Sequence, residues 1–233
     1  MRTPDSRFYC PQIGVGTFML DENESSHAVR VCRATAGDTL ELCDGLGHFA
    51  DATIVKADPK ACEVRIDKFD TVSTGRPKLN LAIACLKDDA LEEVVFHAAQ
   101  TEIDTIYFLR TDFSQEPKNS DLHKLVRRAE LKSLVSLKQS KKPWLTRIEG
   151  PIEFDRWLDT YEGDLVLCDI NGEKSVPVLE QGTTLLVGPE GGFSDKEISR
   201  IKSYQRGKIT LINLGNTRLR ARTAAIIALG KFV

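Results

Sequence analysis

The sequence predicts an α/β protein in which a small β-rich domain precedes a larger domain with a mostly parallel sheet. In residues 1–72, short apolar runs follow one another about every ten residues and are separated by turn signals. From residue 79 onward, strand-like and helix-like segments alternate, which is typical of a parallel α/β sheet. The polar segment Thr71–Lys78 (TVSTGRPK), which contains Gly and Pro, separates the two patterns. We therefore expect domains at residues 1–72 and 73–233.

The first domain is expected to be a small β-barrel. Its predicted strands are the apolar runs Ala28–Val31, Thr39–Leu42, Ala52–Val55 and Cys62–Ile66. Between them stand the turn pairs Gly37-Asp38, Asp44-Gly45 and Asp58-Pro59. Residues 1–75 carry 8 Lys/Arg against 12 Asp/Glu. This acidic balance argues against a broad phosphate-binding face on the first domain.

The second domain begins with Leu79–Leu86, a continuous apolar run of the kind that is buried on both faces of a parallel sheet. Further strands are predicted at Ile103–Leu109, Leu165–Cys168, Thr184–Val187 and Ile209–Ile212. Four helices are predicted. The first is capped by Asp88 or Asp89 and has Leu91, Val94, Val95, Ala98 and Ala99 on its apolar face, and the second is the basic amphipathic helix Asn119–Gln139. The third has Ile198, Ile201 and Tyr204 on one face, and the fourth has the stripe Ala221, Ala224, Ala225 and Ala228.

Two of these strands run directly into glycine turns that lead to helices. Thr184–Val187 ends at Gly188-Pro189-Glu190-Gly191-Gly192, and Ser194 with Glu197 then forms a capping box. Ile209–Ile212 ends in the same way at Leu214-Gly215-Asn216. Such units place backbone N–H groups and helix N-termini at one sheet edge, where α/β proteins hold polar cofactors. The alternative is that the glycines only turn the chain. The dinucleotide and P-loop signatures are both absent from the sequence, which leaves a cofactor other than NAD or ATP, or none.

Composition and charge narrow the class of protein further. We expect a cytoplasmic protein without a membrane span, because no signal-peptide core and no apolar run of about 18 residues is present. The six cysteines are scattered without C-x-x-C spacing, which predicts reduced thiols and no metal site. Residues 118–147 carry 9 basic against 2 acidic residues, and residues 196–222 carry 8 against 1. Basic runs are often solvated helix faces, but two of them beside a cofactor-type turn favour a polyanionic partner.

The pair GPEGGFSDKEI and LGNTRLRARTA resembles the signature of the ribosomal RNA small subunit methyltransferase E family. The pattern of that family is roughly G-P-E-G-G-[FW]-[ST]-x-x-E, followed by L-G-x-R-I-L-R-x-E-T-A. The first half matches at every position. The second departs at several positions, among them 218, where an arginine replaces an aliphatic residue, and 222, where an arginine replaces a glutamate, while Arg220 keeps the family's arginine. The resemblance covers nearly the whole chain but is sharp only in residues 185–229.

The resemblance implies a SPOUT-class fold, whose C-terminal segment forms a knot, behind an N-terminal PUA-like barrel. It also implies S-adenosylmethionine as cofactor, N3 of a uridine in the 16S rRNA of the small ribosomal subunit as target, and a homodimer whose active site uses both subunits. The alanine stripe fits such a dimer and fits packing inside the chain equally well. The residues expected around the cofactor are Ile170, Val187, Gly188, Pro189, Gly191, Gly192, Ile212, Leu214, Gly215, Asn216 and Leu219.

Uridine N3 carries a proton at neutral pH, so the reaction requires a base or cations that favour the uridine anion. Arg220 is the candidate for stabilising that anion or for fixing a phosphate, and a structural salt bridge is the alternative. Glu190 is a candidate base, although capping a turn or holding the cofactor explains it as well. The candidate RNA contacts are Arg30, Arg33, Arg127, Arg128, Lys141, Lys142, Arg218 and Arg222. For Arg30 and Arg33, ordinary surface positions beside a strand are an equal alternative.

Two other functions remain open. The departures from the family pattern at positions 100–102, 112, 138–142, 218 and 222 are compatible with an RNA-binding SPOUT protein of weakened or lost catalysis. The intact glycine turn argues against this alternative, because a protein that only binds RNA does not need it. A SPOUT methyltransferase acting on another RNA nucleotide is the other possibility. The GPEGGF segment and the β-rich first domain both argue against it.

Overall fold

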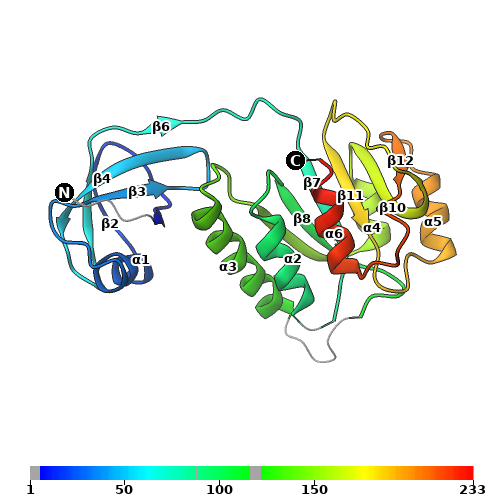
Figure 1. Cartoon of the computed structure of the whole chain (residues 1–233), viewed down its shortest axis with the longest axis horizontal. Coiled ribbons are helices and arrows are strands. Elements are labelled where there is room, and N and C mark those ends of the chain that lie inside the picture. Colours follow the sequence, from blue (N-terminus) through cyan, green and yellow to red (C-terminus); the bar gives the residue numbers. More distant parts are fainter. Residues whose placement is uncertain (1–5, 88, 116–121, 233) are drawn as a thin grey trace. The chain divides into compact units, whose positions relative to one another are not determined.

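A computed structural model describes residues 6–87, 89–115 and 122–232, with the side chains of positions 122 and 123 excluded (Figure 1). The chain divides into two compact units. The first comprises Met1–Gly75 together with Leu137–Leu145, and the second comprises Arg76–Ser136 together with Thr146–Val233. None of the helices in the described ranges has the length and apolarity needed to cross a membrane.

The first unit is built on a mostly antiparallel sheet. Its described strands are β1 (Arg7–Tyr9), β2 (Gly16–Met19), β3 (Thr39–Cys43), β4 (His48–Lys56), β5 (Glu63–Ile66) and β6 (Asp70–Thr71). They pair in the order β1-β3-β4-β5-β2, with β6 beside β4. β1 and β3 are parallel, and the other pairs are antiparallel. The core is formed by fully buried side chains from these strands, among them Phe8, Leu40, Leu42, Ile54, Val64 and Ile66.

The prediction of a strand at Ala28–Val31 is wrong. These residues belong to a π-helical turn, η1 (His27–Val31), which continues helix α1 (Glu22–Ser26). Asp21 starts this helical segment, because its carboxylate accepts a hydrogen bond from the Glu24 N–H at 2.8 Å. The apolar residues of the run still serve the core, since Ala28 is fully buried.

The segment Leu137–Leu145 lies against the strands of the first unit. Its backbone pairs with the turn between β3 and β4: Gly47 N–H donates to the Pro143 carbonyl at 3.0 Å, and Leu145 N–H to the Gly45 carbonyl at 2.9 Å. Lys138 Nζ also forms an ion pair of 2.5 Å with Glu24, whose side chain is buried. This segment therefore packs with strands that lie far from it in the sequence.

The second unit is an α/β unit around one parallel sheet. Its described strands are β7 (Leu79–Ala84), β8 (Thr105–Arg110), β9 (Arg147–Glu153), β10 (Asp164–Glu173), β11 (Thr183–Val187) and β12 (Ile209–Ile212). Its helices are α2 (Ala90–Ala98), α3 (Leu122–Ser140, whose last turn packs with the first unit), α4 (Phe154–Thr160), α5 (Asp195–Lys202) and α6 (Ala221–Leu229). The strand order is β12-β10-β11-β7-β8-β9, and each neighbouring pair is parallel.

Helices cover both faces of this sheet. α2, α3 and α6 contribute to the core on one face, and Figure 1 shows α2 and α6 beside each other there. α4 and α5 contribute Phe154, Trp157, Leu158 and Ile201 to the core on the other face. Both faces of the central strands are thus buried, which is why Leu79–Ala84 and Thr183–Val187 are apolar or small throughout except for Asn80 and the threonines.

The C-terminal segment crosses back over the sheet. β12 lies at one edge, beside β10, whereas α6 packs against α2 and β11. The chain must therefore return across β10 and β11 after β12, as expected for an α/β-knot fold. The stripe Ala221, Ala225 and Ala228 is buried in the core shared with α2, so packing inside the chain accounts for it.

The strands and helices predicted for residues 79–229 are present, with bounds shifted by a few residues. Asp88 and residues 119–121 of the predicted helices lie outside the described residues. β9 and α4 were not predicted from the sequence.

Candidate functional site

The first glycine turn follows directly from the buried strand β11. All five residues of β11 are buried, and the chain leaves the sheet at Gly188. The Gly192 N–H donates to the Pro189 carbonyl at 2.8 Å, which closes the turn. Gly192 has φ of +75°, and a Cβ built on it would meet no atom within 4 Å. The backbone there is both left-handed and open to a ligand, which glycine alone provides without strain.

The Glu197 side chain holds the residues after this turn through hydrogen bonds. The predicted capping box is confirmed: Glu197 Oε2 accepts from the Ser194 N–H at 2.8 Å, and Ser194 Oγ accepts from the Glu197 N–H at 3.3 Å. Glu197 is 4% exposed, and its other oxygen accepts from the Asp112 N–H at 2.9 Å. Asp112 in turn accepts from Ser194 Oγ at 2.5 Å. One carboxylate therefore joins the end of β8 to the start of α5.

Asn213 organises the second glycine turn. Its side-chain oxygen accepts from the Gly215 N–H at 2.7 Å, its side-chain amide donates to the Ile170 carbonyl at 2.6 Å, and its own N–H donates to the Glu173 carbonyl at 2.7 Å. The ends of β10 and β12 are thus tied together. Gly215 has φ of +143°, and its missing Cβ again leaves open space.

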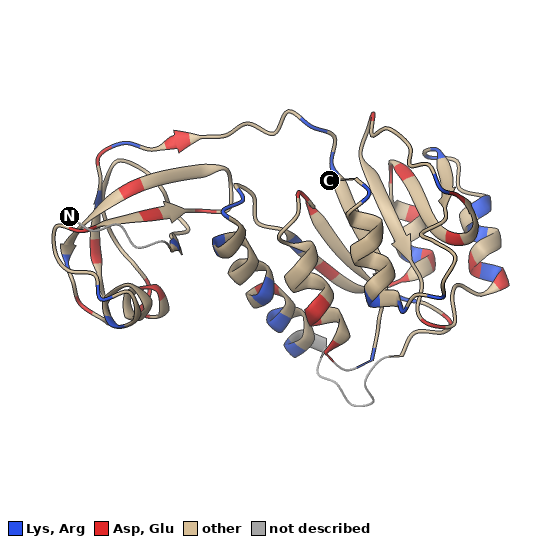
Figure 2. Cartoon of the chain, in the orientation of Figure 1, with Lys and Arg blue, Asp and Glu red and all other residues tan. Residues whose placement is uncertain are grey.

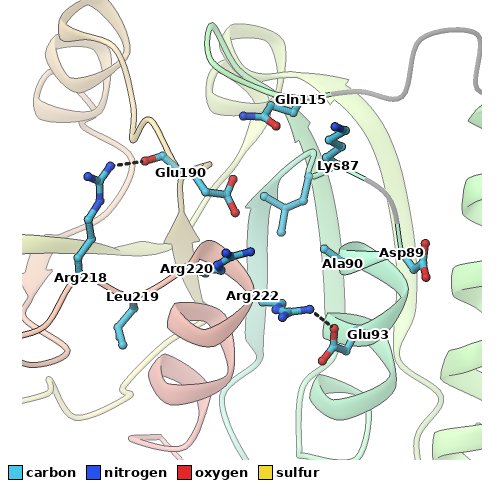
Figure 3. A pocket seen from close by; sticks show the side chains of 11 residues that line it. Lys87, Asp89, Ala90, Glu93, Gln115, Glu190, Arg218, Leu219, Arg220 and Arg222 are labelled. Carbon is cyan, nitrogen blue, oxygen red and sulfur yellow. Dashed lines mark hydrogen bonds and ion pairs between the residues drawn. The ribbon is translucent and has the colours of Figure 1, made fainter.

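The two turns meet through Arg218, whose Nη2 donates to the Glu190 carbonyl at 3.2 Å. Beside this contact lies a cavity of about 610 Å³. Its lining comes from the segment after β7, the start of α2, the segment after β8, the first turn, and the stretch from the second turn into α6: Leu86, Lys87, Asp89, Ala90, Glu93, Gln115, Glu190, Arg218, Leu219, Arg220 and Arg222. The structure therefore brings both predicted catalytic residues, Arg220 and Glu190, to one cavity, which we call the edge cavity (Figure 3).

The three arginines of this cavity differ in their partners. Figure 3 shows Arg218 reaching the Glu190 carbonyl and Arg222 reaching Glu93 of α2, with Arg220 between them. The Arg222–Glu93 ion pair is 2.6 Å long and about half exposed at both ends. Within the described residues, neither the Arg220 guanidinium nor the Lys87 ammonium has a hydrogen-bond or ion-pair partner. Both cations are available to a ligand in the cavity.

The predicted cofactor residues gather at the same edge but differ in exposure. The side chains of Val187 and Ile212 are buried in the core, so only their backbone is available. Ile170 is 73% exposed. The remaining predicted residues lie in the two turns and beside them: Gly188, Pro189, Gly191, Gly192, Leu214, Gly215, Asn216 and Leu219.

The predicted RNA contacts outside the edge cavity fall into three groups. Arg30, Arg33 and Arg127 are exposed and have no partner among the described residues, and Lys and Arg recur along α3 in Figure 2. Arg128 pairs with Glu92 at 2.9 Å, and Lys141 pairs with Glu41 at 3.2 Å. Lys142 is only 9% exposed, which does not fit a phosphate contact.

The cations of the basic stretch at residues 196–222 also differ in their surroundings. Lys196 and Arg200 pair with Asp155 of α4 at 3.2 and 3.3 Å, so these cations join two helices. The cations at 218, 220 and 222 remain at the edge cavity.

Sequence reasoning missed several residues of this edge. Asn213, Asp112, Lys87, Gln115 and Glu93 acquire their roles only when distant segments meet. Asn213 had one local signal, because an Asn two residues before a glycine is a common side-chain-to-backbone turn former. No group of three or more His, Cys, Asp or Glu residues that could hold a metal ion occurs in the described ranges.

Comparison with known proteins shows which family has this arrangement. A family model described as an RNA methyltransferase domain matches residues 74–233, and another described as an RNA methyltransferase PUA domain matches residues 20–67. The ribosomal RNA small subunit methyltransferase E of Mesomycoplasma hyopneumoniae is 30% identical over 172 residues, which cover 72% of this chain and 74% of that protein. The chain belongs to the ribosomal RNA small subunit methyltransferase E family. The resemblance inferred from the two motifs is thereby confirmed.

Other members of the methyltransferase E family agree over more of the chain. The protein of that name from Mycobacterium bovis is 26% identical over 225 residues, 91% of this chain and 84% of that protein. The structure of a methyltransferase from Legionella pneumophila, in complex with S-adenosylmethionine, superposes with a TM-score of 0.86 at 26% identity and covers 99% of this chain and 96% of that one. The methyltransferase E structure from Neisseria gonorrhoeae shares the fold, with a TM-score of 0.85 at 20% identity over 97% of this chain and 95% of that one. The predicted SPOUT fold with an N-terminal PUA-like domain is confirmed.

Proposed function

We propose that this chain uses S-adenosylmethionine to methylate N3 of a uridine in the 16S rRNA of the small ribosomal subunit. The observation that carries the proposal is the unpaired Arg220 guanidinium in a cavity beside two open glycine turns. Membership of the methyltransferase E family supports the reaction class, and the structural likeness to a Legionella methyltransferase with bound S-adenosylmethionine supports the cofactor.

The residues at the carboxyl edge of the sheet fit such a cofactor. Space lies open where a Cβ would stand on Gly192 and Gly215, so a ligand can approach the backbone closely. Polar groups of the adenosine and amino-acid parts would bond to backbone atoms of the two turns, with Leu214 and Leu219 as apolar walls. S-adenosylmethionine supplies an electrophilic methyl group, so the tasks left to the protein are positioning and placement of charge.

Arg220 would supply the cation that the uridine requires. N3 attacks only after it loses its proton, and a nearby cation stabilises the resulting anion. Because no carboxylate in the described residues pairs with Arg220, its charge is not offset by a fixed partner. Lys87 adds a second unpaired cation to the same cavity. The Glu190 side chain, exposed in that cavity, is our candidate for receiving the proton.

RNA would be held by exposed cations of both units. Arg30, Arg33 and Arg127 are unpaired within the described residues and are the strongest candidates. Arg128, Lys141, Arg218 and Arg222 would have to exchange a present partner for phosphate, and Lys142 is excluded from the proposal by its burial.

We further propose that the enzyme acts in the cytoplasm as a homodimer. The alanine stripe of α6 does not support the dimer, because it is buried against α2 of the same chain. The exposed side chains of Ile170, Val178 and Ile227 are apolar surface that a second copy would cover. Sedimentation of the purified protein tests the oligomeric state directly.

The deciding experiment supplies methyl-labelled S-adenosylmethionine and small ribosomal subunits that lack the modification, followed by digestion of the RNA. Label in N3-methyluridine is the expected result. Label in another nucleoside would show that the enzyme methylates a different position in RNA and not uridine N3.

An RNA-binding protein without catalysis is the second candidate. It is favoured by one observation: Arg222, at the position of a family glutamate, is engaged by Glu93 instead of facing the cavity alone. Failure to bind S-adenosylmethionine, measured by calorimetry, together with retained RNA binding would establish this alternative. Cofactor binding without label would instead direct the search to another substrate.

A further inference from the structure

A second cleft, of about 700 Å³, lies on the α4 side of the sheet in the second unit. Thr105, Tyr107 and Arg110 of β8 line it from one end of that strand to the other, and so do residues of β9 from Arg147 to Glu153. It stays open because α4 has only 7 residues and β9 is an edge strand. We call it the β8–β9 cleft. Among the described residues, none lines both this cleft and the edge cavity.

One wall of the cleft is aromatic. The Tyr107 and Trp157 rings have centroids 5.7 Å apart, and Trp157 stacks on Tyr161 at 4.9 Å with an interplanar angle of 22°. All three residues line the cleft. The Trp157 indole N–H is buried and has no hydrogen-bond partner among the described residues. A buried donor without an acceptor is uncommon in proteins. Because Trp157 is only 3% exposed, the ring surface available to a ligand comes mainly from the half-buried Tyr107 and Tyr161.

Cations and carboxylates both line the cleft, and the carboxylates are those of Glu149, Glu153 and Glu162. Lys78, Arg147 and Arg156 are exposed and have no hydrogen-bond or ion-pair partner in the described part of the chain. They come from the start of β7, the start of β9 and α4, so positive charge lies on more than one side. Arg110, by contrast, is paired with Glu153 at 3.3 Å.

We infer that the β8–β9 cleft binds an unpaired nucleotide of a single-stranded RNA segment. An aromatic wall stacks a base and free cations hold the adjoining phosphates, which is how proteins bind single strands. A duplex does not satisfy this arrangement, because its bases are already stacked on one another. The inference rests on the proposed function for the nature of the polymer.

The position of the cleft would allow a single RNA strand to reach both the cleft and the edge cavity. Arg110, at the end of the cleft, leads directly into residues 111–113. Asp112 in that segment is bound by Ser194 and Glu197, and Phe113 lies 3.2 Å from where a Cβ on Gly191 would stand. The cleft therefore ends beside the first glycine turn.

The test measures binding of a fluorescent single-stranded RNA to the full chain by anisotropy over a range of salt concentrations. The variant is Arg147→Ala with Arg156→Ala, and the control is Lys202→Ala with Lys208→Ala, two exposed cations outside both cavities. The cleft variant should raise Kd about tenfold and lower the slope of log K against log salt by about 1.4, since two phosphate contacts are lost. The control should change Kd less than about twofold.

Photocrosslinking gives an independent result that does not depend on charge. RNA substituted with 4-thiouridine should crosslink to peptides that contain Tyr107, Trp157 or Tyr161, and duplex RNA should compete poorly. Equal loss of binding in the cleft and control variants, or crosslinks confined to other peptides, overturns the proposal. A cleft variant that sediments as a smaller species than the wild type also overturns it, because the cleft is then a protein interface.

These outcomes are separate from those of the proposed function. Loss of RNA binding in the cleft variant with no methyl transfer by the wild type supports the cleft and refutes the reaction. Normal RNA binding by the variant together with N3-methyluridine formation by the wild type refutes only the cleft.

Discussion

The edge cavity and the β8–β9 cleft are similar in size and differ in chemistry. The cavity holds arginines, a lysine and carboxylates beside glycine turns, and none of the described residues that line it is aromatic. The cleft has three aromatic rings beside exposed cations, and the carboxylates Glu149, Glu153 and Glu162 also line it. Charge concentrated beside open backbone suits a reaction in which charge develops, whereas rings with cations around them suit a base and its phosphates.

The interactions that hold the two sites in shape also differ. The first turn of the edge cavity is held by the buried carboxylate of Glu197, and the second by three hydrogen bonds of Asn213. The α4 wall of the cleft is joined to α5 by exposed ion pairs of Asp155. A buried carboxylate such as Glu197, and a side chain with several hydrogen bonds such as Asn213, fix geometry more strongly than exposed ion pairs, so mutations at the edge should have the larger effects.

The largest effect is expected for Arg220→Ala, which should lower the rate of methyl transfer about 100-fold or more. The reason is that Arg220 is the unpaired guanidinium between two arginines that already have partners. The affinity for S-adenosylmethionine, measured by calorimetry, should stay within about twofold. The matched variant Arg222→Ala should cost less than about tenfold, because it removes an exposed ion pair. Equal rate losses in the two variants would contradict the special role of Arg220.

Glu197→Ala should lower the free energy of unfolding by about 3 kcal/mol, because it leaves the N–H groups of Ser194 and Asp112 without their acceptor. Urea titration measures the loss. Glu180→Ala, at an exposed position, is the control and should change stability by less than about 0.5 kcal/mol. A loss in Glu197→Ala no larger than in the control would show that the turn is held by other contacts.

Local sequence signals predicted most of the second unit. Alternating apolar runs and glycine turns are short-range features, and they gave β7, β8, β11 and β12 with α2, α5 and α6. β9 was missed because Arg147–Glu153 contains Gly150 and Pro151 and is partly exposed along its length. α4 carried a usable signal, since Phe154, Trp157, Leu158 and Tyr161 have helical spacing. In the first unit, the capping signal at Asp21 and Glu24 should have outweighed the strand-like run that follows.

The sequence predicted the two turns of the candidate site and the residues on or beside them, including Glu190 and Arg220. Glycines and a capping box marked both turns, since these features act over a few residues. The partners that distinguish the arginines were not predictable, because Glu93 meets Arg222 only when α2 packs beside α6. The β8–β9 cleft escaped prediction for the same reason: its rings and cations come from three strands, α4 and the residues that follow it.

Gly215→Ala should raise the Kd for S-adenosylmethionine about tenfold, since a Cβ would fill the open space beside the second turn and strain a backbone with φ of +143°. Gly37→Ala is the matched control, because Gly37 in the first unit also has a positive φ of +89° and open space around it. Both variants should lose comparable stability, and only Gly215→Ala should lose cofactor affinity. An equal Kd in the two variants would place the cofactor away from this turn.

The smallest effect concerns the ion pairs that hold the α4 wall of the cleft. The hydrogen bond from Lys196, followed by that from Arg200, holds the pKa of Asp155 below its ordinary value. A carboxyl whose pKa is lowered in the folded state contributes stability above the unfolded-state pKa of about 3.9 and loses it as the pH falls through the lower folded value. Because the side chain of Asp155 is 46% exposed, Asp155→Asn should cost only about 0.5 kcal/mol at neutral pH. Urea titrations of both proteins should show this difference shrinking below about pH 4 and in high salt. A difference independent of pH would mean that Asp155 joins α4 to α5 through its shape and hydrogen bonds and not through its charge.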